Sequence, residues 1–197
     1  MPVKRHDWVW LTSQWAGDAP PDVIAHHQAG LPFVVARQAP QDDKQKCNLG
    51  LTTIPKVRTG FSVVKTDIHR IASPPLLETA LSVAPDPWRP GLVALNQALP
   101  GLQVFGSLAW QYVTGQSHMT EQSDVDILFT PTTRAAIEPG LRILAESDLR
   151  LDGEMVFPDG CAVSWKEWVL GKNPVLIKCM QSVGLWDRAV MLKAFST

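Results

Sequence analysis

The sequence has few cysteines and no long apolar run. The three cysteines, Cys47, Cys161 and Cys179, are widely spaced among 197 residues and form no Cys-x-x-Cys pair, so neither a zinc ribbon nor a thioredoxin-type motif is indicated. We expect three buried or incidental free thiols in a reducing cytosol. No segment approaches the roughly 18–20 apolar residues of a membrane span, and no apolar run follows the charges near the N-terminus. We therefore predict a cytoplasmic protein without a membrane partner.

Charge of either sign is also scarce. The chain has 18 Lys and Arg against 19 Asp and Glu, only 19% of its residues are charged, and 45% are apolar. A near-neutral balance argues against a generic nucleic-acid binder, which needs a basic surface to release counterions. The apolar content excludes a long disordered chain, and the length fits one large domain or two small ones. A small anionic substrate remains compatible with this balance, since a few local charges suffice to bind it.

Proline, glycine and tryptophan are abundant by contrast. There are 16 Pro, 13 Gly and 8 Trp, against one Tyr. Five prolines between Ser73 and Pro90 bracket one short predicted helix, so we place a domain boundary near residue 90. An N-terminal α/β subdomain is then expected over 1–90, and a second domain over 91–197. We predict core positions for Trp8, Trp10, Trp88 and Trp186, and one shared helical face for Trp165 and Trp168.

The hydrophobic pattern predicts a mixed α/β fold. In the first half it favours a helix over 21–29 and strands over 6–11, 31–37 and 57–64. From residue 76 onward it favours helices over 76–83, 92–99, 108–113, 132–146 and 165–170. The strands expected there are 102–105, 124–129, 149–157, 161–164 and 175–180.

Two carboxylates on one predicted strand carry the strongest chemical signal. Asp124 and Asp126 alternate with Val125 and Ile127, so both carboxylates project from the same side of an otherwise apolar strand. Their Cα atoms would lie roughly 6.6–6.8 Å apart, within reach of one divalent cation. Mg²⁺ commonly binds one or two carboxylates together with substrate phosphates, so the pair suits phosphoryl or nucleotidyl transfer. The alternative interpretation is that this is an edge strand whose outer face is exposed to solvent.

Residues around this pair extend the predicted site. Gly106-Ser107 falls between a predicted strand and a helix, where the backbone can approach a phosphate and the helix N-terminus offers free N–H groups. Asp152 and Glu154 share one face of a later strand and are both candidates for a third carboxylate. Arg58 stands beside an apolar strand and is a candidate to neutralise a phosphate. A solvated base on an edge strand is an equally good interpretation of Arg58.

The order strand, Gly-Ser, helix and Asp-x-Asp strand resembles the nucleotidyltransferase superfamily with the DNA polymerase β-like fold. This resemblance implies that residues 91–197 form a nucleotidyltransferase core. The longer pattern is similar to a narrower family, the malonate decarboxylase holo-[acyl-carrier-protein] synthases, which are phosphoribosyl-dephospho-CoA transferases. It comprises Gly-Ser-Leu-Ala-Trp-Gln-Tyr-Val-Thr-Gly at 106–115 and Ser-Asp-Val-Asp at 123–126. The segments 5–11 and 165–168 also resemble the ends of that family, so the likeness spans most of the chain.

This resemblance implies a specific reaction. The enzyme would use Mg²⁺ to transfer the phosphoribosyl-dephospho-CoA group from triphosphoribosyl-dephospho-CoA to a serine of the malonate decarboxylase acyl carrier protein, releasing pyrophosphate. Asp124 and Asp126 would be the catalytic metal ligands, and Gly106 and Ser107 would hold the triphosphate. We favour Glu154 as the third carboxylate, because Asp152-Gly153 is expected to form a bulge. The N-terminal half would complete the donor pocket, where a tryptophan is a candidate to stack on the donor's adenine.

Two other functions fit the same residues. The first is a nucleotidyltransferase, such as an adenylyltransferase, that acts on another small molecule or protein. The second is a non-catalytic nucleotide-binding adaptor that keeps the fold. The intact Asp124/Asp126 pair argues against the adaptor, because a pure binder has no need of two metal ligands.

Overall fold

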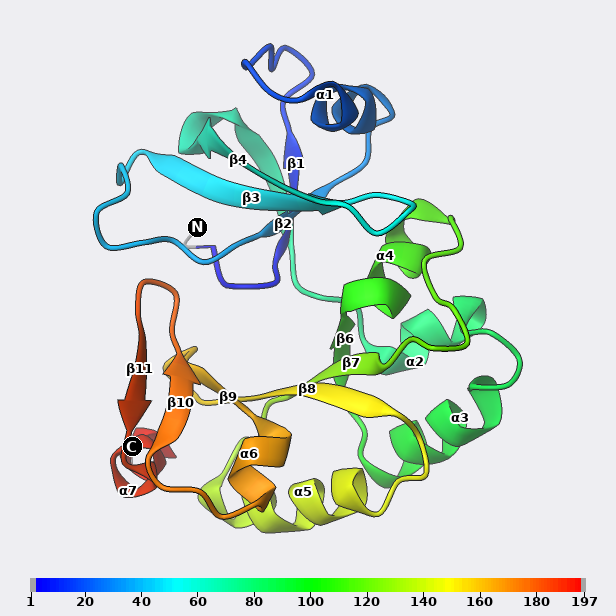
Figure 1. Cartoon of the computed structure of the whole chain (residues 1–197), viewed down its shortest axis with the longest axis vertical. Coiled ribbons are helices and arrows are strands. Elements are labelled where there is room, and N and C mark those ends of the chain that lie inside the picture. Colours follow the sequence, from blue (N-terminus) through cyan, green and yellow to red (C-terminus); the bar gives the residue numbers. More distant parts are fainter. Residues whose placement is uncertain (1–2, 196–197) are drawn as a thin grey trace. The chain divides into compact units, whose positions relative to one another are not determined.

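The computed structural model describes residues 3–195, which form two compact units (Figure 1). The N-terminal unit comprises the residues up to Pro74 together with Met180–Ser182, and the C-terminal unit comprises Pro75–Cys179 with the residues from Val183 onward. The division falls before the boundary that we expected near residue 90. The reason is that the segment after Pro74 pairs within the C-terminal unit, where Leu76 forms a β-bridge with Gln103 and the Leu77 N–H donates to the Leu102 carbonyl.

The N-terminal unit is built on a five-stranded antiparallel sheet in the order β4-β3-β2-β1-β5. Its strands are β1 (Trp8–Leu11), β2 (Phe33–Val35), β3 (Lys46–Thr52), β4 (Arg58–Val64) and β5 (Ile68–Ala72). Helix α1 (Pro21–Gln28) joins β1 to β2, and a 3₁₀ turn (Lys65–Asp67) precedes β5. Cys47, Leu49 and Leu51 alternate along β3 and are buried, so one face of the sheet forms the core of this unit. Strands β3 and β5 were not predicted.

The C-terminal unit contains a six-stranded mixed sheet in the order β11-β10-β9-β8-β7-β6. Its strands are β6 (Gln103–Phe105), β7 (Val125–Phe129), β8 (Leu151–Val156), β9 (Ala162–Ser164), β10 (Val175–Lys178) and β11 (Val183–Trp186). Its helices are α2 (Leu77–Ala80), α3 (Arg89–Ala98), α4 (Gly106–Thr114), α5 (Ile137–Ala145), α6 (Trp165–Val169) and α7 (Arg188–Leu192), with 3₁₀ turns at Leu81–Val83, Arg134–Ala136 and Lys193–Phe195. The predicted mixed α/β class is therefore confirmed, although β11 and α7 were missed.

One parallel pair gives this sheet its character. Strands β7 and β8 run parallel, whereas the other neighbouring strands are antiparallel. A parallel pair needs a crossover connection, which α5 supplies by burying Ile137, Leu141 and Leu144. Helices α5 and α6 pack against each other, and α6 packs on β8 (Figure 1). None of the helices that the structure describes is long and apolar enough to cross a membrane.

The tryptophans divide into buried and exposed groups. Trp8 is buried, as predicted, and so are Trp165 and Trp168, which were expected only to share one helical face. Trp88 was expected in the core but is only half-buried. Trp186 was expected in the core but has 38% of its surface exposed, because it lies on the edge strand β11. Trp10 was also expected in the core, but it is only half-buried and lines a pocket of the N-terminal unit.

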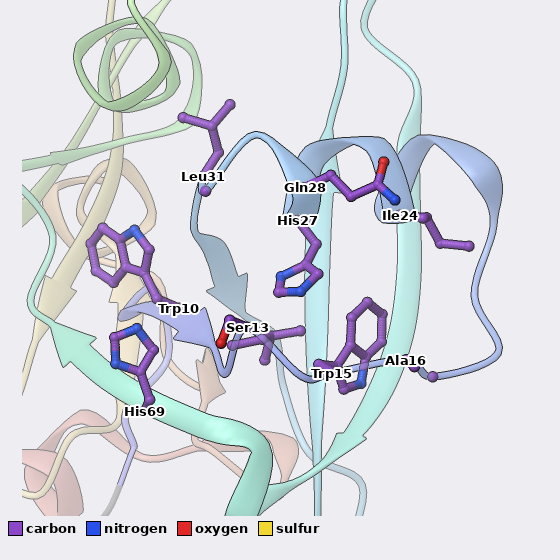
Figure 2. Close-up of a pocket in the computed structure, with 12 residues that line it drawn as sticks. Trp10, Ser13, Trp15, Ala16, Ile24, His27, Gln28, Leu31 and His69 are labelled. Atoms are coloured by element: carbon purple, nitrogen blue, oxygen red, sulfur yellow. The ribbon is translucent and has the colours of Figure 1, made fainter.

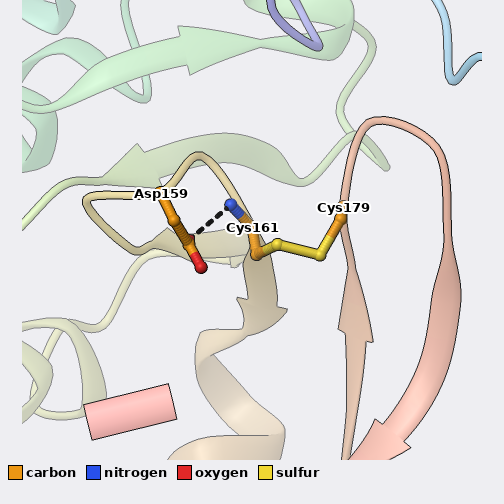
Figure 3. The surroundings of a disulfide bond; sticks show 3 residues. All are labelled: Asp159, Cys161 and Cys179. Atoms are coloured by element: carbon orange, nitrogen blue, oxygen red, sulfur yellow. Dashed lines mark hydrogen bonds between the residues drawn. A yellow bond between two sulfur atoms is a disulfide. The ribbon is translucent and has the colours of Figure 1, made fainter. Parts of the chain in front are cut away.

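Cys161 and Cys179 form a disulfide (Figure 3), so the prediction of three free thiols is wrong for this pair. Ala162 and Lys178 are paired in the antiparallel β9–β10 ladder, which places the two cysteines opposite each other with their Cα atoms 4.1 Å apart. The Cys161 N–H also donates to Asp159 Oδ1 at 3.0 Å. The sequence did not indicate the bond, because only the strand pairing brings the two residues together. Cys47 is a free, buried thiol.

We expect this disulfide to stabilise the C-terminal unit. The two cysteines are 18 residues apart, and closing a loop of that size is worth about 3 kcal/mol when the unfolded chain is constrained. Reduction should therefore lower the midpoint of guanidinium-induced unfolding of the wild-type protein. The double variant Cys161→Ala/Cys179→Ala should unfold at the lower midpoint with or without reductant. Three titratable thiols in the unfolded, unreduced protein would contradict the bond.

Candidate active site

Gly106 and Asp126 meet where β6 ends and α4 begins. Phe105 is the register partner of Asp126 in the antiparallel β6–β7 pair, so the next residue, Gly106, lies beside the Asp126 side chain. Gly106 has φ +61°, and a Cβ at this position would overlap the carboxylate oxygen Asp126 Oδ2. Only glycine satisfies both the left-handed backbone and this close approach. The Gly-Ser and Asp-x-Asp elements are therefore two sides of one site.

The N-terminus of α4 faces this junction. The helix begins at Gly106, two residues before the predicted 108, and no side chain caps its first turn. The first N–H groups of an α-helix have no partner within the helix and attract anions. Ser107 is half-buried in this first turn and adds a hydroxyl group. The turn therefore offers hydrogen-bond donors beside a carboxylate.

Asp124 and Asp126 occupy different environments. Asp124 immediately precedes β7 and is exposed. Its Oδ1 forms an ion pair with Arg150 Nη2 at a distance of 3.0 Å. Asp126 lies within β7 and is half-buried, whereas Val125 and Ile127 are fully buried. Because β7 lies between β6 and β8, it is not an edge strand, and the alternative of a solvent-exposed edge strand is wrong.

The two candidates for a third carboxylate also differ. Asp152 is the register partner of Asp126 in the parallel β7–β8 pair, so their side chains are neighbours on one face. Glu154 is opposite Leu128, one step along that face, with 6% of its side chain exposed and Lys178 Nζ 3.1 Å from its Oε1. The bulge that we expected at Asp152-Gly153 is absent, because Gly153 pairs with Ile127 in unbroken register. Glu154 is therefore no longer favoured over Asp152 as the third carboxylate.

Basic side chains accompany three of these carboxylates. Besides Arg150 and Lys178, Lys166 Nζ lies 3.9 Å from Asp152 Oδ1, with both side chains about half exposed. The sequence analysis did not identify these three basic residues as neighbours of the carboxylates. The alternation of Arg150, Asp152 and Glu154 along one segment was the available signal for Arg150. The acid cluster is thus partly neutralised by the protein itself.

Arg58 lies elsewhere. It is the first residue of β4, the edge strand of the N-terminal sheet, and it is exposed. The site around Asp126 is formed within the C-terminal unit, so Arg58 is not among the residues that this unit brings together. Its predicted role toward a phosphate stays a prediction.

The loop from α4 to β7 is held by buried contacts that we did not predict. His118 is 4% exposed, and its ring stacks on Trp110 with the centroids 6.0 Å apart. Gln111 of α4 accepts the Met119 N–H through Oε1 at 3.0 Å. These contacts fix the path of the chain just before Asp124.

The oxygen ligands present fit Mg²⁺ better than a softer metal. Among the described residues, no group of three or more His, Cys, Asp or Glu side chains is placed to hold a metal ion. Asp124 and Asp126 would therefore supply only part of a coordination shell. This matches the usual behaviour of Mg²⁺, which takes one or two carboxylates and completes its shell with water and substrate phosphates.

The fold and this site define a two-unit α+β protein in which paired carboxylates lie beside a helix N-terminus, an arrangement suited to group transfer at phosphorus. The chain belongs to the phosphoribosyl-dephospho-CoA transferase family and is a transferase. Residues 4–74 match the model of the phosphoribosyl-dephospho-CoA transferase MdcG N-terminal domain, and residues 76–189 match that of the C-terminal domain. The junction of the two family domains coincides with the division between the two structural units.

Curated relatives cover nearly the whole chain. A phosphoribosyl-dephospho-CoA transferase of Bradyrhizobium diazoefficiens is 33% identical over 95% of this chain and 91% of its own length. Proteins of the same name from Xanthomonas euvesicatoria and Xanthomonas axonopodis pv. citri are each 34% identical, over 95% and 98% of this chain and equal shares of their own lengths. No solved structure matches the chain, so the DNA polymerase β-like fold stays a prediction.

The close approach of Gly106 to Asp126 predicts an unusually costly glycine substitution. Gly106→Ala combines a left-handed backbone with a steric overlap, whereas Gly101→Ala meets the same kind of backbone (φ +84°) with no atom within 4 Å of the new Cβ. We expect Gly101→Ala to cost about 1 kcal/mol of unfolding free energy and Gly106→Ala at least about 1–2 kcal/mol more. Chemical denaturation measures both. Equal losses would contradict the contact.

Proposed function

We propose that this chain transfers the phosphoribosyl-dephospho-CoA group from triphosphoribosyl-dephospho-CoA to a serine of the malonate decarboxylase acyl carrier protein, with release of pyrophosphate. Family membership supports the group that is transferred. The observation that carries the proposed mechanism is the meeting of the α4 N-terminus with Asp126 at Gly106. A donor with a triphosphate and a site that joins N–H donors to carboxylates are chemically matched.

The proposed reaction is a substitution at the phosphorus that bears the ribosyl group. The carrier serine Oγ forms a new bond to this phosphorus as the bond from phosphorus to the pyrophosphate oxygen breaks. The electron pair of the broken bond leaves with pyrophosphate, and the serine proton passes to a base. The product is a phosphodiester between the carrier protein and the prosthetic group.

The residues of the α4 turn would bind the triphosphate. The N–H groups at the start of α4 and the Ser107 hydroxyl donate to phosphate oxygens, and the lack of a side chain at Gly106 lets the Asp126 carboxylate lie beside them. Binding on fixed donors orients the leaving pyrophosphate away from the attacking serine, which is what in-line displacement requires.

Asp124 and Asp126 would hold Mg²⁺. A bound Mg²⁺ would neutralise negative charge on the attacking and leaving oxygens. The ion pair between Asp124 and Arg150 does not oppose this role, because both side chains are about half exposed and such pairs contribute little stability. Arg150 is then released beside the site, where it can pair with a phosphate.

Asp152 is the better candidate for the third carboxylate. Its position beside Asp126 in the β7–β8 ladder and its partial exposure support a role in accepting the serine proton or orienting the metal. The burial of Glu154 against Lys178 supports a structural role for that residue instead.

Substitution of the paired carboxylates tests the mechanism. Asp124→Asn and Asp126→Asn should each slow pyrophosphate release from triphosphoribosyl-dephospho-CoA in the presence of the acyl carrier protein about 1,000-fold, since a lost metal ligand removes several kcal/mol of transition-state stabilisation. Asp86→Asn is a matched control, because the Asp86 side chain is 91% exposed and forms an ion pair with nearby Arg89. Full activity of both site variants would refute the site, and release of pyrophosphate from ATP would favour the adenylyltransferase alternative.

A second pair of variants distinguishes Asp152 from Glu154. We expect Asp152→Asn to lower kcat about 100-fold with little change in stability, as for loss of a positioned proton acceptor. Glu154→Gln should keep kcat within a few fold but lower the unfolding free energy, because it leaves the Lys178 ammonium without its carboxylate. Steady-state kinetics and denaturation of the same preparations measure both effects. The reverse pattern would make Glu154 the catalytic residue.

A further inference from the structure

The N-terminal unit contains a pocket that the site around Asp126 does not use. Its volume is about 640 Å³, within the range of small-molecule sites. Residues from β1, the loop after it, α1 and β5 line it, and Figure 2 shows Trp10 and His69 on one side of it and Trp15 and His27 on the other. No Asp or Glu is among the lining residues. The pocket therefore combines aromatic rings with an absence of negative charge on its walls.

A β-bulge brings one of these rings into the pocket. In the β1–β5 pair, Trp10 is opposite Arg70 and Leu11 is opposite Ile68, so His69 is an extra residue on β5. In a regular strand His69 and Arg70 would point to opposite faces of the sheet. Bulges redirect side chains and often occur next to functional sites. Here the imidazole of His69 lies beside the indole of Trp10 (Figure 2).

Both indoles are held in place by neighbouring groups. The Arg70 guanidinium carbon lies 4.2 Å from the centroid of the Trp10 ring, which supports the ring and adds positive charge beside the pocket. The Trp15 ring meets His27 edge-on at 5.2 Å and Phe61 at 6.0 Å. A Cβ on Gly17 would come within 2.7 Å of the Trp15 ring, so the small residue at 17 permits this orientation. Rings fixed in advance lose little entropy when a ligand binds.

These walls suit a flat, aromatic ligand with polar edges. Indole faces stack on any nucleobase, and the imidazoles, the Ser13 hydroxyl and the Gln28 amide can hydrogen-bond to the ring edge. Arg70 would favour an attached phosphate. A pantetheine arm is flexible and aliphatic, so it would not use the four aromatic rings.

We propose that this pocket binds the adenine base of the CoA-derived donor, stacked on the indoles of Trp10 and Trp15 and contacted at its edge by His27 and His69. The proposal rests on the proposed function for the identity of the ligand. It assigns donor recognition to the N-terminal unit and the chemistry at phosphorus to the C-terminal unit.

Calorimetric titration of the full chain tests the pocket with three probes: 3′-dephospho-CoA, AMP and 4′-phosphopantetheine. We expect 3′-dephospho-CoA and AMP to bind competitively and 4′-phosphopantetheine not to compete. Ser13→Trp fills the pocket from an exposed position and should weaken 3′-dephospho-CoA at least about tenfold, the effect of losing one stacked base. Gln14→Trp places the same ring at the adjacent exposed residue, which does not line the pocket, and should bind as the wild type does.

His69→Ala is the second variant. His69 is exposed, so its removal leaves the core of the sheet intact, and we expect affinity for AMP to fall about threefold to tenfold. Equal affinities in Ser13→Trp and Gln14→Trp, with circular dichroism showing both folded, would overturn the proposal. Loss of 4′-phosphopantetheine binding with AMP binding retained in Ser13→Trp would also overturn it, because the arm would then be the ligand.

Failure of the pocket and failure of the proposed function give different results. If the wild type releases pyrophosphate from triphosphoribosyl-dephospho-CoA in the presence of the acyl carrier protein and Ser13→Trp leaves KM unchanged, the pocket is wrong and the function stands. If 3′-dephospho-CoA binds in a manner sensitive to Ser13→Trp but no pyrophosphate is released with the carrier protein present, the function is wrong and the pocket stands.

Discussion

The close approach of Gly106 to Asp126 is the constraint on which the candidate site depends. It requires the antiparallel pairing of β6 with β7, a left-handed residue at the strand-to-helix junction, and the absence of a side chain there. Together these place a helix N-terminus, which favours anions, beside a carboxylate, which favours cations. A phosphate with a bound metal ion satisfies both at once. In the proposed mechanism, this geometry connects the backbone of the C-terminal unit to chemistry at phosphorus.

Local charge explains how a nearly neutral chain can hold an acidic site. Arg150, Lys166 and Lys178 each pair with one carboxylate, so the cluster carries less net charge than its acids alone would give. The pairs of Asp124 and Asp152 are exposed and contribute little stability, whereas Glu154 is buried and its partner Lys178 is partly exposed. In the proposed function, this difference separates the carboxylates that would bind a ligand from the one that stabilises the fold. The disulfide joins Cys179, the residue after Lys178, to Cys161, the residue before the neighbouring strand β9.

The sequence predicted the elements whose patterns are local. The apolar strand around Asp126, the glycine at the start of α4 and the crossover helix α5 all have clear periodicity or punctuation, and the structure contains them. Strand β3 was missed, although it alternates, because Asn48 and Gly50 weaken its strand propensity. The disulfide, the pairing of Asp126 with Asp152 and the bulge at His69 depend on strand register. Register is set by contacts between distant segments, so no local pattern reveals it.

The proposed transfer is measured most directly by the intact mass of the malonate decarboxylase acyl carrier protein after incubation with this enzyme, Mg²⁺ and triphosphoribosyl-dephospho-CoA. We predict one mass increase equal to the phosphoribosyl-dephospho-CoA group, located on a serine by peptide mapping, with one pyrophosphate released for each carrier modified. An unmodified carrier in the presence of folded enzyme, or a carrier that is instead adenylylated when ATP is supplied, would contradict it.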